Sequence, residues 1–412
     1  MKKLYTSLLY LFFLVNHSFG QVNLACDGQR YIDDVFQEVT KTTVVYGFND
    51  NIFGINQNLR MDIYEPEGDT HDQRPVIIFA FGGSFIFGSR QSMESYCEQF
   101  ARKGYVAATI DYRLGFLGTN EAAVTGAVIR AVSDMKAAVR YFRMDADTDN
   151  EFKIHPDFIL VGGYSAGAIT ALHAAYLDDE DDVEDNILDI INDNGGFNGN
   201  TGDAENQSYS SEVFAVYNLS GALQRKEYLD EDETEPLVSY HGVDDDIVPI
   251  GNGVANSLAE VDGSELLHEQ ADLHGLSNYI KVVDGGGHVD IHSGILFDDE
   301  LEEFESQSHL FFHDLMCLDA QTNTTDLSLI QQPVDVFPNP STDLIQFDFG
   351  KIESNYDVRV FDQLGRLVTV FENQNDVIFS LEKDEIGEGV FFVNVLFEEV
   401  VVVPLTRKVV FE

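Results

Sequence analysis

Apolar runs of strand length alternate with helical patterns between residues 40 and 318, and this alternation restricts the fold more than any other feature. Three runs, Pro75–Phe81, Tyr105–Tyr112 and Phe158–Gly162, are almost continuously apolar, as is typical of parallel strands covered on both faces. Between them, Glu121–Arg143 keeps its apolar residues largely at helical spacing. The alternation predicts an α/β fold with an eight-stranded, mostly parallel sheet.

The other expected elements follow the same patterns. The remaining predicted strands are Thr43–Tyr46, Arg60–Tyr64, Val213–Leu219, Leu237–Tyr240 and Tyr279–Val283. The remaining predicted helices are Ser92–Lys103, Ala166–Leu177, Gly253–Val261 and Ile291–Leu318. Before the sixth strand, Asp178–Ser211 forms an insertion that opens with a run of Asp and Glu and ends rich in Gly and Asn. We expect a solvated excursion there, because an apolar lid would carry fewer charges; a mobile cap and a calcium site are the alternatives.

The charge balance excludes two classes of partner. The chain has 24 Lys and Arg against 72 Asp and Glu, a formal net charge of −48. No basic field is present to hold phosphates, so nucleic-acid binding and binding to an anionic membrane are not expected. With 31 Phe and 17 Tyr, the acidity indicates solubility rather than disorder.

The N-terminus has the pattern of an export signal. Lys2 and Lys3 precede the apolar run Leu4–Val15, and small residues at Ser18 and Gly20 provide a cleavage site. The run is too short to span a bilayer. Residues 1–20 are therefore predicted to be a signal peptide, and the mature protein to lie outside the inner membrane.

Three cysteines, Cys26, Cys97 and Cys317, allow one disulfide in an oxidising compartment and leave one thiol over. Three pairings are possible. The pairing Cys26–Cys317 is favoured, because it would tie the first mature residues to the end of a helical segment. Three separated cysteines without paired histidines form no zinc pattern.

The composition changes near the C-terminus. A polar stretch at residues 321–333 is typical of a linker after the domain at residues 21–320. Residues 334–412 carry short alternating strands at regular spacing, which predicts a small β-sandwich. The expected strands are Asp357–Phe361, Leu367–Phe371, Val377–Leu381, Val390–Leu396 and Lys408–Phe411.

Four ordered motifs in this C-terminal region resemble the sorting domain of the bacterial type IX secretion system. They are Val336-Phe337-Pro338-Asn339-Pro340-Ser341-Thr342-Asp343, Val360-Phe361-Asp362-Gln363-Leu364-Gly365-Arg366, Gly389-Val390-Phe391-Phe392-Val393 and Arg407-Lys408-Val409-Val410. The resemblance implies that outer-membrane secretion machinery is a partner and that the protein is secreted or placed on the cell surface. It leaves open whether this domain is removed afterwards.

One junction between a predicted strand and a predicted helix carries chemistry. In Gly163-Tyr164-Ser165-Ala166-Gly167 the strand ends on glycines and a helix of small residues starts directly after Ser165. This arrangement forces a serine into a strained turn with its hydroxyl exposed, which is typical of a nucleophile. The flanking glycines relieve the crowding of such a turn.

A serine nucleophile needs a base and an orienting carboxylate. The loops after the last two predicted strands lie at the same sheet edge as Ser165, and they supply His288 and three adjacent aspartates. We expect His288 as the base and Asp245 as the acid, with Asp244 and Asp246 as alternatives. His241 is expected to buttress the turn, and His292, His309 and His313 to be ordinary surface or packing residues.

The loop after the third strand ends in glycines. Backbone N–H groups of Gly83, Ser84 and Ala166 are the expected oxyanion-hole donors. Candidate residues of a substrate cleft are Phe85, Phe87, Phe116, Tyr164 and Ile247.

Together these pieces resemble the α/β-hydrolase superfamily on its carboxylesterase/lipase side. The matching segments are Phe81-Gly82-Gly83-Ser84-Phe85, Asp111–Gly118, Val132–Arg140, Gly163–Gly167, His241–Pro249 and Gly287-His288. The resemblance implies ester hydrolysis through a covalent acyl-enzyme, with no metal and no cofactor. Many carboxylesterases have His in place of Phe81 and Gly in place of Ser84, a departure that argues against bulky tertiary-alcohol esters.

The first functional hypothesis is a secreted serine esterase acting on short acyl, aryl or polyester substrates. The alternatives are a lipase on long-chain esters, a prolyl-oligopeptidase-like peptidase and a non-catalytic surface binding protein. The peptidase shares the His-Gly-x-x-Asp loop, but no propeller is expected before the catalytic region. The natural ester, the acyl chain length and the oligomeric state do not follow from the residues.

Overall fold

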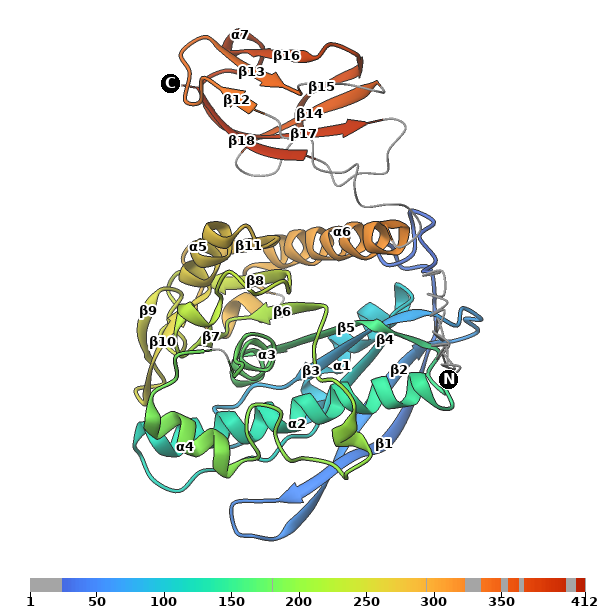
Figure 1. Cartoon of the computed structure of the whole chain (residues 1–412), viewed down its shortest axis with the longest axis vertical. Helices are drawn as coiled ribbons and strands as arrows, with labels where there is room; N and C mark the ends of the chain where they lie inside the picture. Colours follow the sequence, from blue (N-terminus) through green and yellow to red (C-terminus); the bar gives the residue numbers. More distant parts are fainter. Residues whose placement is uncertain are drawn as a thin grey trace, which may run out of the picture. The chain divides into compact units, whose positions relative to one another are not determined.

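The computed structural model describes residues 24–179, 181–293, 295–322, 335–349, 355–362, 367–397 and 405–411. The predicted signal peptide, residues 323–333 of the predicted linker and Gln363–Arg366 of the second sorting motif lie outside these ranges. The chain divides into two compact units, one of which is Leu24–Cys317 and the other of which holds the C-terminal strands (Figure 1). Among the described residues, no helix has the length and apolar character needed to cross a membrane.

The first unit is built on one sheet of eight strands in the order β1-β2-β4-β3-β5-β6-β8-β11. These strands are β1 (Val39–Asp50), β2 (Asn56–Pro66), β3 (Arg74–Ala80), β4 (Val106–Ile110), β5 (Ile154–Tyr164), β6 (Ala215–Leu219), β8 (Leu237–Gly242) and β11 (Asn278–Val283). β1 pairs antiparallel with β2 and β2 with β4, and the pairings from β4 to β11 are parallel. Every predicted strand of this region overlaps one of the eight, and the predicted α/β-hydrolase fold class is confirmed.

Helices cover both faces of this sheet, with α6 on one side and α2 and α3 on the other (Figure 1). The helices are α1 (Glu94–Arg102), α2 (Glu121–Asp147), α3 (Ala166–Tyr176), α4 (Asp185–Asp193), α5 (Ser264–His274) and α6 (Asp298–Thr322). Aromatic rings join α1 and α6 to the sheet: Phe100 lies 5.6 Å from Tyr217, and Phe304 lies 5.3 Å from the same ring. Such ring pairs stabilise the core beyond the area that they bury.

Two predicted helices differ from the observed elements. Gly253–Val261 forms not a helix but the hairpin of β9 (Asn252–Ala255) and β10 (Ala259–Gly263). Its turn places Asn256 and Ser257 at φ values of 47° and 60°, a left-handed conformation that no helix continues. The last predicted helix begins later, at Asp298, since the short 3-10 helix η4 (Asp290–His292) occupies its expected start.

The insertion is also anchored rather than merely solvated. Helix α4 buries Ile187 and Ile191, and α4 packs against α2. From α2, the buried Arg140 guanidinium donates to the Asn198 carbonyl at 2.7 Å, and Lys136 donates to the Phe197 carbonyl at 2.9 Å. Burial lowers the pKa of Lys136 to about 8. These bonds give two buried cations their partners and tie residues 197–198 to α2, so the insertion is not wholly the solvated excursion that was expected.

The C-terminal unit contains two antiparallel sheets, as the alternating strands predict. One sheet has the order β12-β13-β16 and the other β15-β14-β17-β18. The strands are β12 (Asp335–Phe337), β13 (Leu344–Asp348), β14 (Tyr356–Asp362), β15 (Leu367–Gln374), β16 (Ile378–Glu382), β17 (Gly389–Phe397) and β18 (Leu405–Phe411), with the short helix α7 (Lys383–Ile386) after β16. Buried residues from both sheets, among them Phe347, Val358 and Val393, form one core.

A disulfide joins the two ends of the first unit. Cys26 is bonded to Cys317, with 5.7 Å between their Cα atoms and 291 residues of sequence separation. Cys97 is a buried thiol of α1, and burial raises its pKa well above the usual value. A buried thiol of raised pKa is unreactive.

Candidate active site

Ser165 stands at the sharp junction between β5 and α3. Its backbone angles are φ 56° and ψ −119°, a strained conformation for a residue with a side chain. The turn is possible because two glycines let backbones approach: a Cβ at Gly167 would lie 1.9 Å from the Ala80 carbonyl oxygen, and one at Gly163 would lie 2.4 Å from Gly167. Strand β5 and helix α3 therefore fix the serine at the carboxyl edge of the sheet.

Two side chains from later loops meet this serine. His288 follows β11, and its Nε2 lies 2.8 Å from Ser165 Oγ. Asp245 follows β8, and its Oδ2 lies 2.6 Å from His288 Nδ1. With Nδ1–H donating to the carboxylate, Nε2 is free to accept the serine proton. All three side chains are buried.

The carboxylate of Asp245 is held in its charged form. Its Oδ1 accepts the backbone N–H groups of Ile247 and Val248 at 2.9 and 2.8 Å. Burial opposes ionisation, but the hydrogen bonds from His241 and His288 outweigh it and keep the pKa of Asp245 well below its usual range. The two alternative aspartates, Asp244 and Asp246, are exposed and do not approach the histidine.

His241 lies behind this carboxylate and is fully buried. Its Nδ1 is 2.7 Å from Ser264 Oγ, and its Nε2 donates to the Val248 carbonyl at 2.9 Å while lying 3.3 Å from Asp245. Both ring nitrogens therefore have partners, and the ring supports the turn that carries Asp245.

The glycine loop after β3 lies beside the serine. A Cβ at Gly82 would lie 3.1 Å from the Ser165 Cβ, and Gly83 has a φ of 131°. Ser84 itself adopts a φ of 50°. Among the described residues, neither the Ser84 N–H nor the Ala166 N–H has an acceptor. Free donors at this place are available to a ligand oxygen.

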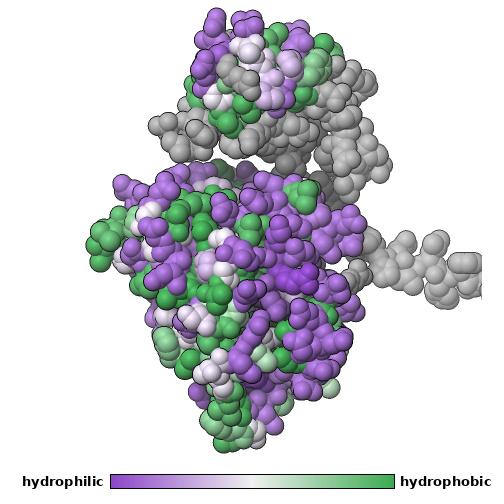
Figure 2. Space-filling view, turned by 90° about the vertical axis from the view of Figure 1, so that its left-hand side faces the viewer, coloured by the Kyte–Doolittle hydropathy of each residue, from purple (hydrophilic) through white to green (hydrophobic). Residues whose placement is uncertain are grey.

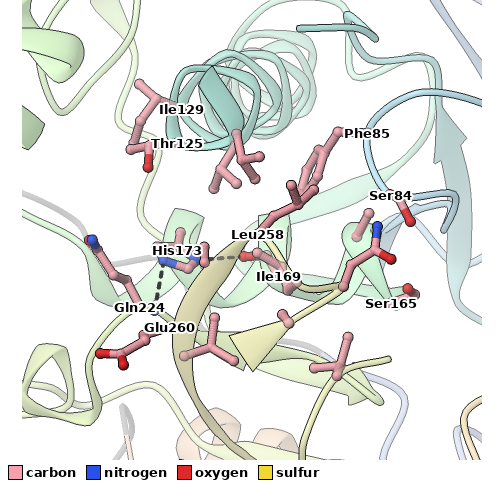
Figure 3. A pocket seen from close by; sticks show the side chains of 18 of the residues that line it. Ser84, Phe85, Thr125, Ile129, Ser165, Ile169, His173, Gln224, Leu258 and Glu260 are labelled. Atoms are coloured by element: carbon pink, nitrogen blue, oxygen red, sulfur yellow. Dashed lines mark hydrogen bonds between the residues drawn. The ribbon is translucent and has the colours of Figure 1, made fainter. Parts of the chain in front are cut away.

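A pocket of about 820 Å³, including its open mouth, extends from Ser165 between α2, α3 and the β9–β10 hairpin (Figure 3). Its walls are mostly apolar, with Val128 and Ile129 from α2, Ile169 from α3 and Leu258 from the hairpin turn. Gln224 and Glu260 lie at the end away from the serine (Figure 3). Apolar walls with few polar groups are typical of a site for small molecules.

Of the candidate cleft residues, Phe85 and Ile247 line this pocket, and Phe87, Phe116 and Tyr164 do not. Phe87 instead points into solvent. Tyr164 packs on His288 with 5.3 Å between the rings and donates its hydroxyl to the His288 carbonyl at 2.9 Å. It positions the histidine rather than forming a wall.

Two further histidines lie near the site: His173, which no motif singled out, and His292, which was expected to be an ordinary surface or packing residue. His173 lines the pocket, where its Nδ1 donates to the Ile169 carbonyl at 2.8 Å and its Nε2 accepts the Gln224 N–H at 3.2 Å (Figure 3). Burial lowers its pKa to about 4, so the ring is neutral. His292 packs 4.7 Å from the Tyr164 ring in η4, not in the long helix expected for it.

Within the described ranges, no group of three or more His, Cys, Asp or Glu side chains is placed to hold a metal ion. The site therefore consists of hydrogen-bonded side chains, free backbone donors and an apolar pocket.

Comparison with known families matches two parts of the chain. Residues 61–226 match the BD-FAE family, an α/β-hydrolase-type esterase domain. Residues 335–411 match the secretion system C-terminal sorting domain. The second match indicates export by type IX secretion to the cell surface or beyond it.

Individual relatives match over shorter stretches. Lipase 1 of Geotrichum candidum is 28% identical over 123 residues, which cover 28% of this chain and 21% of the lipase. Esterase-5C of Drosophila miranda is 30% identical over 125 residues, which cover 29% of this chain and 22% of the esterase. The matches thus span about a fifth of the length of these relatives. A thermophilic esterase of Thermogutta terrifontis, solved with propionate bound, is 22% identical with a TM-score of 0.48, over 66% of this chain and 94% of that one.

Proposed function

We propose that this esterase/lipase-like α/β-hydrolase, which carries a type IX sorting domain, is a secreted serine esterase that hydrolyses carboxylic esters. Short acyl and aryl esters are its expected substrates, together with polyester chains. The observation that carries the proposal is the hydrogen-bonded line from Ser165 through His288 to Asp245, which opens into an apolar pocket.

The reaction starts when Ser165 Oγ attacks the ester carbonyl carbon and His288 Nε2 takes the hydroxyl proton. Asp245 keeps the proton on Nδ1 and stabilises the imidazolium that forms. The carbonyl oxygen becomes an oxyanion, which accepts hydrogen bonds from the backbone N–H groups of Gly83, Ser84 and Ala166. The new bond to Ser165 forms as the π bond of the carbonyl opens and leaves its electron pair on that oxygen, and the ester bond to the alcohol oxygen is still intact.

The tetrahedral intermediate collapses when the bond to the alcohol oxygen breaks and His288 donates its proton to that oxygen. An acyl group remains bonded to Ser165. Water then repeats the sequence: His288 removes its proton, the oxygen attacks the acyl carbon, and Ser165 recovers its proton as the carboxylic acid leaves. The acidic surface of the protein repels the carboxylate product.

The pocket favours an ester over a peptide substrate. Its lining is mostly apolar, and Glu260, the carboxylate among the lining residues that the structure describes, lies at the end away from Ser165 (Figure 3). An apolar acyl or aryl group can be buried there at about 25 cal/mol for each Å² removed from water. Peptides present additional amide groups, which such walls leave without partners.

The test is hydrolysis of p-nitrophenyl esters from acetate to palmitate by the wild-type protein and by Ser165→Ala. Ser293→Ala is the matched control, because that hydroxyl is exposed and bonds only the Asp290 carbonyl. We expect turnover of short chains, abolished in Ser165→Ala alone. A preference for palmitate would indicate a lipase, and cleavage of a peptide anilide without ester turnover would indicate a peptidase. No turnover by a folded sample would refute the proposal.

A further inference from the structure

Exposed hydrophobic side chains of the first unit are concentrated at one edge of its sheet. Sixteen large hydrophobic residues of this unit are exposed among the described residues, and ten of them lie at the edge where the parallel strands end. Figure 2 views the side of the molecule that bears the β9–β10 hairpin, and hydrophobic residues gather there in patches between hydrophilic ones. We call these ten residues the apolar rim.

Half of the apolar rim comes from the β1–β2 turn and from the loops after β3 and β4. These residues are Phe53, Ile55, Ile86, Phe87 and Leu117. The β1–β2 turn lies at this edge because β2 runs antiparallel to β4. The three segments are adjacent: the Gly115 N–H donates to the Phe85 carbonyl at 2.7 Å, and a Cβ at Gly115 would lie 2.9 Å from Ile52.

The other half comes from the segments that follow β8 and β11. These residues are Val243, Val254, Val289, Ile295 and Leu296. The two loops are tied together, since the Asp244 N–H donates to the Gly286 carbonyl at 2.9 Å. Val289 directly follows His288, and Val254 directly precedes Ala255, which lines the pocket.

The apolar rim therefore borders the mouth of the pocket on both sides. Ser84 of the pocket wall lies two residues before Ile86, and Ala255 of the opposite wall follows Val254. An exposed apolar patch of this kind marks a binding surface more often than chance. Whatever covers the apolar rim also covers the entrance to Ser165.

We propose that the apolar rim docks the protein onto the surface of a droplet of a water-insoluble, uncharged ester, with the pocket mouth facing that surface. The inference rests on the proposed esterase function. Charge selects an uncharged surface: the net charge is −48, and exposed Asp244 and Asp246 lie among the rim residues, so an anionic surface is repelled. The attraction is apolar and is expected to persist at high salt.

Adsorption tests the proposal without catalysis. The Ser165→Ala protein is mixed with tributyrin droplets in high salt, and the protein left in solution is measured. Leu117 and Leu296 lie on opposite sides of the mouth, are 72% and 70% exposed and do not line the pocket. Leu273 on α5 is a matched control, since it is 73% exposed and lies outside the rim.

We expect Leu117→Gln with Leu296→Gln to weaken adsorption at least about tenfold, the effect of removing one buried leucine from an apolar contact. Leu273→Gln is expected to adsorb like its parent. Equal adsorption of both variants would overturn the proposal. So would a wild-type dimer that the double rim substitution converts to a monomer, because the rim would then be covered by a second copy.

Activity on two butyrate esters separates this proposal from the esterase function itself. In the background with Ser165 intact, the double rim variant is expected to lose about tenfold in rate on tributyrin droplets and to retain the wild-type kcat/KM on dissolved p-nitrophenyl butyrate. A parallel loss on both esters would overturn the docking role. If the wild type hydrolyses no dissolved ester, the proposed esterase function is refuted. The adsorption measurement still tests whether the apolar rim binds a droplet surface.

Discussion

Asp245→Asn is the most informative single substitution, because it keeps the shape of the side chain and changes only its hydrogen-bonding character. The asparagine carbonyl can still accept the N–H groups of Ile247 and Val248, which Oδ1 of the aspartate accepts at 2.9 and 2.8 Å. On the other side an NH₂ group replaces Oδ2 and faces His288 Nδ1 at 2.6 Å. Two donors cannot face each other there, so Nδ1 must lose its proton.

The consequence reaches the serine through the imidazole ring. When Nδ1 accepts the amide proton, the single ring proton moves to Nε2, which then points a donor at Ser165 Oγ 2.8 Å away. The ring can no longer remove the serine proton. The same change in a Ser-His-Asp triad lowers kcat by about 10⁴, which corresponds to roughly 5.5 kcal/mol of transition-state stabilisation.

The neighbouring aspartates provide matched controls. Asp244→Asn and Asp246→Asn remove the same charge from exposed positions of the same loop. The assay is kcat/KM on p-nitrophenyl butyrate at pH 7.5, with thermal unfolding to show that each variant is folded. We expect about a 10⁴-fold loss for Asp245→Asn and less than a twofold change for the controls. If folded Asp245→Asn kept a tenth of the wild-type activity, the assignment of the acid would be wrong.

Three further outcomes are expected. Gly83→Ala should lower kcat about 10²-fold, because its Cβ would lie 2.0 Å from the Phe87 carbonyl oxygen of the same loop. Gly275→Ala should leave kcat unchanged, since that glycine also has a positive φ, of 75°, but a Cβ there would meet open space. Cys26→Ser should lower the free energy of unfolding by about 4 kcal/mol in urea titrations, and reductant should bring the wild type to the same midpoint without affecting the variant. Burial, together with a hydrogen bond to Glu235, raises the pKa of Glu233 to about 9. The protonated Glu233 therefore stabilises the folded state below pH 4.5, and this stabilisation is lost as the pH rises towards 9. Over this range the melting temperature of Glu233→Gln should fall less than that of the wild type.

The sheet could be predicted because strands that are buried on both faces consist almost entirely of apolar residues. Every residue of β3 is buried, and its apolar run from Pro75 to Ala80 is visible without any structure. The hairpin of β9 and β10 differs from the predicted helix because Val254, Leu258 and Val261 have helical spacing although they lie in a hairpin. The Asn256-Ser257 pair was the available signal, because asparagine tolerates the left-handed turn of a tight hairpin.

The candidate site divides in the same way. Ser165, His288 and Asp245 could be located because each follows a recognisable strand, and parallel strands bring their ends together. Apart from the candidate nucleophile and oxyanion-hole residues, only the loop residues Phe85 and Ile247 of the pocket could be predicted. Most of its walls come from α2, α3 and the β9–β10 hairpin, elements far apart in the chain whose apolar residues resemble ordinary core. The roles of Arg140 and Lys136 could not be predicted either. A helical pattern does not show that a buried cation donates hydrogen bonds to the carbonyls of an insertion.

The bond between Cys26 and Cys317 changes how the first unit responds to force. A pull applied to the chain on both sides of this unit, as when a chain is drawn by its tail through a secretion apparatus, enters at one sulfur and leaves at the other. The disulfide bond carries the tension, so the sheet and helices between Cys26 and Cys317 are not stretched. The site at Ser165 is thus mechanically insulated from its own sorting tail, and only reduction of the bond would place it under strain.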